Sequence, residues 1–102
     1  MEKKLGTNAL ETLGKIVVLM DATNDQQELD RLEALRVKLT KQIAALVEKT
    51  VDAASKEYQD AQNGLIAASQ AIDKAIAGLE TIAKVINTVA QGVELVAKVA
   101  AA

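Results

Sequence analysis

The sequence predicts an all-α protein, and three observations lead to this prediction. Apolar residues in the second half of the chain recur on a seven-residue frame, which is the spacing of one face of a helix. The chain of 102 residues contains no proline and only five glycines, and Tyr58 is its single aromatic residue. Ala, Val, Ile and Leu supply most of the apolar half. This composition favours closely spaced helices over sheets or ligand pockets.

A first, short helix is expected over residues 8–20. Thr7 or Asn8 can cap this helix, because Glu11 stands three residues after Asn8, as a capping box requires. Residues 16–20 are all apolar and would also suit a strand, but no other segment offers a pairing partner, so we expect a helix. The inner stripe of this helix is expected to contain Leu10, Leu13, Val17 and Met20, with Ile16 at its edge.

A second helix is expected over residues 25–62, after a break at residues 21–24. Asp25 and Glu28 form a second candidate capping box at its start. Apolar residues follow at intervals of three or four between positions 29 and 61, which predicts one inner face along most of the segment. Tyr58 lies on that face, so we expect a core tyrosine whose hydroxyl group bonds to a neighbouring helix.

A third helix is expected over residues 65–100, where the seven-residue frame is most regular. Its apolar arc is wide, because the residues that flank the central rows are also apolar and exceed what one partner helix can cover. The two central rows are Leu65, Ile72, Leu79, Ile86, Val93 and Ala100, and Ala68, Ala75, Ile82, Val89 and Val96.

The predicted architecture depends on Asn63 and Gly64, which separate the second and third helices. As a tight turn, this pair joins them into a long antiparallel hairpin, and the short first helix completes a three-helix bundle in a single domain, residues 1–102. The alternative is one continuous helix from about residue 25 to residue 100, because the apolar stripe passes through the pair in phase. Gly78 and Gly92 are expected to allow close helix packing, either within the hairpin or between chains.

The composition also limits the function. The net charge is −2, with twelve basic residues dispersed among fourteen acidic ones, so nucleic acid is not an expected partner. The chain has no histidine and no cysteine, which removes Ser-His and Cys-His catalysis and the common zinc sites. A calcium loop over residues 21–32 fails, because Gln26 occupies the position of the required glycine. We therefore expect a non-enzymatic protein with no catalytic residue, no cofactor and no metal.

A partner is expected at the turn end of the hairpin, because the first helix is too short to cover it. Two such open ends would meet as a four-helix bundle in a homodimer or a larger assembly, and another helical protein is the second candidate partner. The leading expectation is therefore an assembly or adaptor protein that acts through its apolar helix faces. The predicted interface residues are Ala54, Tyr58, Ala61, Leu65, Ala68, Ile72, Ile76 and Leu79.

The alternative function is a membrane-active or secreted helical protein whose apolar hairpin inserts into lipid or lies on it. The mean hydropathy of +0.12 is positive, and only six charged residues follow Gly64. The lack of a lysine-rich edge and of aromatic anchors argues against a membrane surface. No segment suits a secretory signal or a membrane span, so the default expectation is a cytoplasmic protein.

Overall fold

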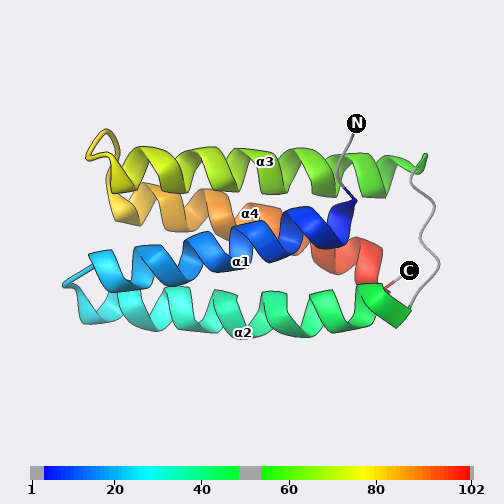
Figure 1. Ribbon diagram of the computed structural model, residues 1–102, viewed down its shortest axis with the longest axis horizontal. Helices are drawn as coiled ribbons and strands as arrows, with labels where there is room; N and C mark the ends of the chain where they lie inside the picture. The colour runs from blue at the N-terminus through cyan, green and yellow to red at the C-terminus, as the bar shows by residue number, and fades with distance from the viewer. Residues whose placement is uncertain (1–3, 49–53, 102) are drawn as a thin grey trace.

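The computed structural model describes residues 4–48 and 54–101, and four helices make up most of this part of the chain (Figure 1). The described residues contain no strand, so the prediction of an all-α protein is confirmed and residues 16–20 are helical. The prediction of three helices is wrong. The helices are α1 (Leu5–Ala22), α2 (Gln26–Glu48), α3 (Lys56–Ile76) and α4 (Ile82–Ala101).

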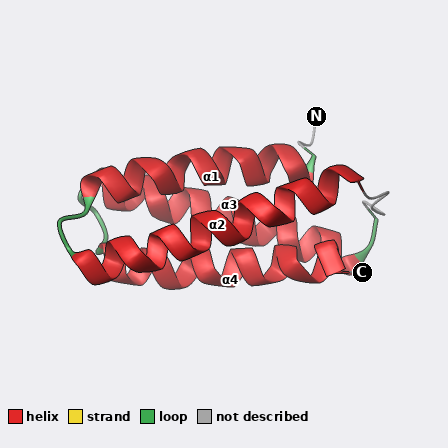
Figure 2. Ribbon diagram, turned by 90° about the horizontal axis from the view of Figure 1, so that it is seen from below, coloured by secondary structure: helices red, strands yellow, loops and turns green. Residues whose placement is uncertain are grey.

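The helices form two antiparallel hairpins, α1–α2 and α3–α4, which pack side by side. α1 lies against α2 and α3, and α4 lies against the same two helices, so α1 and α4 occupy opposite corners of the bundle. Figure 1 shows that α1 runs parallel to α3, and α2 runs parallel to α4. Figure 2 shows that all helices follow the long axis of a molecule that measures 39 × 24 × 17 Å. A four-helix core is therefore closed within one chain.

The chain reverses direction at Gly78, and not at Asn63 and Gly64, which lie inside α3. Gly78 has a φ of +78°, a left-handed conformation that costs glycine little. Its N–H donates to the carbonyl of Ala75 at 3.1 Å, and the N–H of Leu79 donates to the carbonyl of Lys74 at 2.8 Å. This Schellman motif ends the helix. The predicted turn at residues 63–64, the predicted helix over 65–100 and the continuous helix over 25–100 are all wrong.

A second break separates α2 from α3. Ser55 has an extended backbone, and its Oγ accepts the N–H of Tyr58 at 3.2 Å, so it is the N-cap of α3. The predicted single helix over 25–62 is therefore wrong. Residues 49–53 of that segment lie outside the described part of the chain.

The two predicted caps have different outcomes. α1 begins at Leu5, with Thr7 and Asn8 inside the helix, so the predicted cap at Thr7 or Asn8 is wrong. The predicted cap at Asp25 is confirmed, because its Oδ1 accepts the N–H groups of Gln27 at 2.8 Å and of Glu28 at 3.1 Å. The carboxylate of Glu28 does not return to Asp25, and accepts the Thr23 hydroxyl at 2.8 Å.

α3 and α4 approach each other most closely at Gly64 and Gly92. A Cβ atom added to Gly92 would lie 2.8 Å from the carbonyl oxygen of Gly64, and one added to Gly64 would lie 3.2 Å from Cα of Gly92. The backbones are therefore in contact, and both glycines are needed for packing. Gly92 thus packs within the chain, whereas Gly78 forms the turn.

The predicted seven-residue frame is retained in the core, except where the turn interrupts it. Leu79 belongs to the same row as Leu65 and Ile86 but is 76% exposed, because it follows the end of α3. No helix in the described ranges is both long enough and apolar enough to cross a membrane. The residues of the predicted rows that are at most 1% exposed are Leu65, Ala68, Ile72, Ile86, Val89, Val93 and Val96.

Candidate functional site

The predicted interface residues do not share one surface. An interface through the buried members would require the bundle to open, so the interface role of the set stays a prediction. Ile76 and Leu79 are the large apolar members that remain at the surface, 47% and 76% exposed. Ala61, Leu65, Ala68 and Ile72 are buried in the core, Tyr58 is half-buried, and Ala54 is exposed.

The predicted inner stripe of α1 is wrong at Leu10 and Val17, because the helix is rotated relative to that prediction. Its other members do face the core, since Leu13 and Met20 are half-buried against it and Ile16 is fully buried. Leu10 and Val17, which were expected inside, are 57% and 43% exposed, and the neighbouring Val18 is 51% exposed. Apolar residues surround nearly the whole circumference of α1, so the sequence pattern favours no single face strongly. The residues that the structure buries are Leu5, Ala9, Thr12, Ile16 and Leu19.

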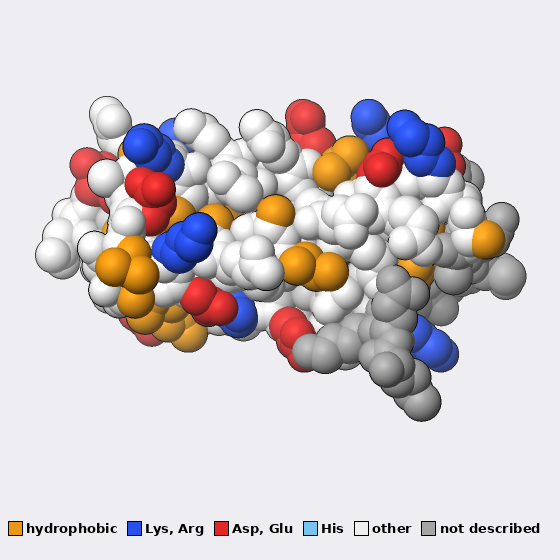
Figure 3. Space-filling view, turned by 90° about the horizontal axis from the view of Figure 1, so that it is seen from above, with side chains coloured by type: hydrophobic (Ala, Val, Ile, Leu, Met, Phe, Trp, Pro, Cys, Tyr) orange, Lys and Arg blue, Asp and Glu red, His pale blue; other side chains and the backbone are white. Residues whose placement is uncertain are grey.

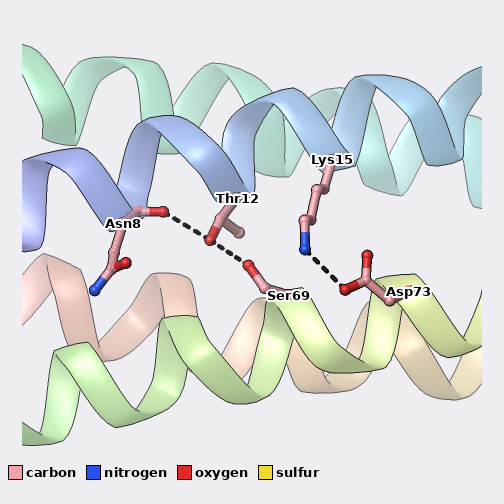
Figure 4. Close-up of polar contacts among 5 residues, drawn as sticks. All are labelled: Asn8, Thr12, Lys15, Ser69 and Asp73. Carbon is pink, nitrogen blue, oxygen red and sulfur yellow. Dashed lines mark hydrogen bonds and ion pairs between the residues drawn. The ribbon is translucent and has the colours of Figure 1, made fainter. Parts of the chain in front are cut away.

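Polar contacts with α3 fix the rotation of α1 (Figure 4). The hydroxyl of Thr12, which is fully buried, donates to the carbonyl of Asn8 at 2.9 Å and lies 3.1 Å from Oγ of Ser69. One turn further on, Nζ of Lys15 lies 2.8 Å from Oδ2 of Asp73. Turning α1 about its axis would break the contacts of Thr12 with Ser69 and of Lys15 with Asp73, whereas the hydrogen bond from Thr12 to Asn8 lies within α1 and would remain.

We call this row of polar contacts between α1 and α3 the seam. More polar contacts extend it toward the start of both helices. The side-chain amide of Asn8 donates to Oε1 of Gln62, and the N–H of Leu5 donates to the hydroxyl oxygen of Tyr58 at 2.8 Å. The Tyr58 contact confirms the prediction that its hydroxyl group bonds to a neighbouring helix. An open groove with side chains of both charges runs beside the seam, and its lining includes Glu11, Lys15, Ser69 and Asp73.

Exposed apolar residues lie along α1 and at the end of this seam. Because α1 and α3 are parallel and Lys15 pairs with Asp73, the residues one turn later, Val18 and Ile76, lie at the same level. Leu79 follows at the α3–α4 connection. Figure 3 shows hydrophobic side chains gathered near that end of the bundle and scattered elsewhere on the face in view. We call the following residues the apolar patch: Leu10, Val17, Val18, Ile76 and Leu79, which are 43–76% exposed.

The rest of the described surface is more polar. Among the side chains whose exposure is described, α2 and α3, the two neighbours of α1, each carry one further exposed large apolar residue, Val37 and Ile66. Within its described residues, α4 exposes no large apolar side chain, and it lies at the corner opposite α1. The exposed apolar surface is therefore concentrated on the α1 side of the bundle and at the α3–α4 connection.

Among the charged side chains that the structure describes, one pair is clearly perturbed electrostatically, on the surface of α2. Nε of Arg36 donates to Oε2 of Glu33 at 3.0 Å, and a second, short contact joins Nη2 to Oε1. These hydrogen bonds hold the pKa of Glu33 below its ordinary value and raise the pKa of Arg36. Both groups are exposed, so this pair is a local surface contact.

Val18 was not among the predicted inner or interface residues, although the sequence contains a pattern that predicts exposed apolar side chains in this part of α1. Residues 16–20 form an uninterrupted apolar run. On a helix, five consecutive residues point in all directions, so such a run must expose some apolar side chains unless other helices surround it. The same run therefore supplies Ile16 and Leu19 to the core, and Val17 and Val18 to the surface.

Comparison of the chain with known protein families, with curated proteins and with solved structures found no significant match. The contacts and the exposed surface of this chain are therefore the basis for its functional assignment.

Proposed function

We propose that the protein is a non-enzymatic helical interaction protein, with an assembly or adaptor role, and that it binds its partner through the apolar patch. The supporting observation is the exposure of five large apolar side chains by 43–76% while the core is closed within one chain. Exposed apolar residues that gather in this way are typical of protein interaction sites. The bundle does not have to open for these residues to be contacted.

The size of the patch indicates a reversible interaction. Fully burying one Val, Leu or Ile side chain contributes roughly 1.5–3 kcal/mol, so five half-exposed side chains supply on the order of 5 kcal/mol. Loss of translational and rotational freedom costs about as much or more. We therefore expect polar contacts at the rim to contribute to the affinity, and charged residues near the patch to select the partner.

Site-specific photo-crosslinking in the source cell tests this proposal. A photoreactive amino acid replaces Val18 or Leu79 in the full-length chain, and the same amino acid replaces Gln91, which is exposed on α4, as the matched control. We expect discrete protein adducts from positions 18 and 79, and at least tenfold less adduct from position 91. Equal labelling at all three positions, or adducts with lipid alone, would contradict the proposal.

Charge substitutions at the same positions separate binding from folding. Val18→Glu and Leu79→Glu place a charge on exposed positions, so the free energy of unfolding should change by less than about 0.5 kcal/mol. Each substitution should nevertheless remove the adduct formed from the other position. Ala83→Glu on the exposed side of α4 is the control and should leave the adduct intact.

A further inference from the structure

We propose that the partner of the apolar patch is a second copy of this chain, with the two α1 helices antiparallel and crossing at Gly14. This inference rests on the proposed function, because it names the partner of the same surface. Like surfaces related by a twofold axis are the commonest way in which proteins self-associate.

Gly14 is the natural crossing point on the exposed face of α1. It is exposed, and a Cβ atom added to it would meet no atom within 4 Å. The lack of a side chain allows a second helix to approach the backbone closely. Leu10 and Val18 both lie four residues from Gly14, on either side of it. A twofold axis at Gly14 therefore places Leu10 of each copy level with Val18 of the other copy.

The charges at the ends of α1 favour the antiparallel orientation. Lys4 lies at the start of the helix, and Asp21 and Asp25 lie at its end, all of them exposed. Antiparallel pairing about Gly14 brings Lys4 of one copy close to the end of α1 of the other, where Asp21 lies in the last helical turn and Asp25 lies just beyond the helix. Parallel pairing would instead place Asp21 beside the Asp21 of the second copy, which repels.

Charges also favour a crossing at Gly14 over one nearer to the C-terminal end of α1, where Val17 and Val18 lie. A twofold axis between Val17 and Val18 would bury both valines more fully, but it would bring Glu11 of one copy level with residues 24 and 25 of the other. That arrangement brings Glu11 of one copy to the α1–α2 connection of the other, where the exposed carboxylate of Asp25 lies just beyond the end of α1. Juxtaposed like charges disfavour an interface, so the position at Gly14 is preferred.

The predicted dimer is weak because one helix supplies most of the contact. α1 has 18 residues and is about 27 Å long, which gives less area than the roughly 800 Å² per partner of a standard interface, even with Ile76 and Leu79 at one end. We expect half of the chains to be dimeric at about 100 µM, so that the dimer exchanges rapidly with the monomer.

Disulfide cross-linking of the purified full-length protein tests the geometry, because the natural chain contains no cysteine. Two copies of Gly14→Cys should cross-link, and so should a mixture of Leu10→Cys with Val18→Cys, because these positions come level across the axis. Leu10→Cys alone should not cross-link, because position 10 of one copy is level with position 18 of the other. The two cysteines would then be eight residues apart, about 12 Å along the helix. Gln91→Cys on α4 gives the rate of random collision.

We expect the Gly14→Cys variant and the mixed pair to form covalent dimer at least tenfold faster than Leu10→Cys alone or Gln91→Cys. Sedimentation equilibrium of the chain without cysteine should show a monomer–dimer equilibrium, which Val18→Glu weakens at least tenfold. Cross-linking of Leu10→Cys with itself would indicate parallel helices and overturn the proposal. Equal rates at all positions, or only monomer up to about 1 mM, would also overturn it.

The two experiments fail in different ways. If the purified protein is monomeric but positions 18 and 79 capture a different protein in the cell, the second copy is wrong as the partner, and the proposed interaction function stands. If the purified protein dimerises as described but positions 18 and 79 give no protein adduct in the cell, the geometry of self-association stands, and the proposed function is wrong.

Discussion

The hydroxyl oxygen of Tyr58 on α3 accepts the backbone N–H of Leu5, the first residue of α1, at 2.8 Å. The first N–H groups of a helix have no partner within the helix, and Lys4, the N-cap of α1, provides no side-chain cap. Tyr58 therefore caps α1 from a helix more than fifty residues away in sequence. Together with the hydrogen bond from Asn8 to Gln62, this contact joins the start of α1 to the start of α3.

Tyr58→Phe should lower the free energy of unfolding by about 1 kcal/mol, because the Leu5 N–H loses its partner while the aromatic ring is retained. Chemical denaturation measures this change, and amide hydrogen exchange at Leu5 reports it locally. The exchange of amides in the middle of α2 serves as the internal control. Unchanged stability together with unchanged exchange at Leu5 would show that water replaces the hydroxyl group without loss.

Gly92→Ala should lower the free energy of unfolding by about 2 kcal/mol or more, because the new methyl group would meet the backbone of Gly64 and force α3 and α4 apart. Gly64→Ala should cost less, because the nearest atom to its new methyl group is the flexible Cδ1 of Leu95, at 2.8 Å. The matched control is Gly6→Ala in α1, where a Cβ atom meets nothing within 4 Å and stability should not fall. Equal stability of all three variants would contradict the close contact of the two helices.

Gln42→Met should leave stability unchanged or raise it by about 1 kcal/mol. The Gln42 side chain is 7% exposed, and its amide donates to the carbonyl of Val93 at 3.1 Å. Its Oε1 is buried without a hydrogen-bond partner among the described residues. Methionine has a similar shape and removes that unpaired acceptor, so the desolvation cost disappears. A loss of more than about 1 kcal/mol in thermal or chemical unfolding would instead indicate that Oε1 has a partner, such as a bound water molecule.

Thr12→Val should cost about 1–2 kcal/mol, because it removes the buried hydroxyl group that contacts both Asn8 and Ser69. Ser69→Ala should cost less, because Ser69 is only partly buried. A double-mutant cycle should give a coupling of about 0.5–1 kcal/mol between the two positions. Purely additive costs would mean that the two hydroxyl groups do not bond to each other, although both helices could still be in contact.

Glu33 should titrate below the ordinary pKa of a glutamate, because Arg36 donates hydrogen bonds to its charged form. A lowered pKa in the folded state means that the contribution of this pair to stability is present above the unfolded-state pKa and is lost as the pH falls through the folded-state pKa. The effect should be small because both side chains are exposed. Carboxyl NMR titration measures the pKa, which Arg36→Gln should return toward its ordinary value, whereas Lys84→Gln should not.

The helical character of the chain and part of its core were predictable from local chemistry. Three local features predict helices: the absence of proline, the seven-residue rows and the cap at Asp25. Each depends only on residues close together in the sequence, so it favours a helix however the helices pack. Leu65, Ile72 and Ile86 were placed correctly inside for the same reason. The hydroxyl contact of Tyr58 was also predicted, because a tyrosine on the inner face of a helix needs a partner for its oxygen.

The turn positions were predicted wrongly because glycine has two uses that look alike in a sequence. Gly64 follows Asn63 and suits a turn, yet it lies in a helix and allows contact with Gly92. Gly78 suits close packing in a helix, yet it forms the turn with a positive φ. The absence of a side chain favours both uses, so only the position of the neighbouring helix distinguishes them.

The sequence by itself determined that this chain is helical, where α2 begins and which residues of α3 and α4 face inward, because these features follow from short-range hydrogen bonding and from the periodicity of one helix. Only the tertiary structure decided which face of α1 is exposed. Apolar side chains surround α1, so its rotation depends on the buried hydroxyl group of Thr12 and on the pairing of Lys15 with Asp73 across the seam. Those contacts leave Leu10, Val17 and Val18 at the surface, and the candidate binding site is the result.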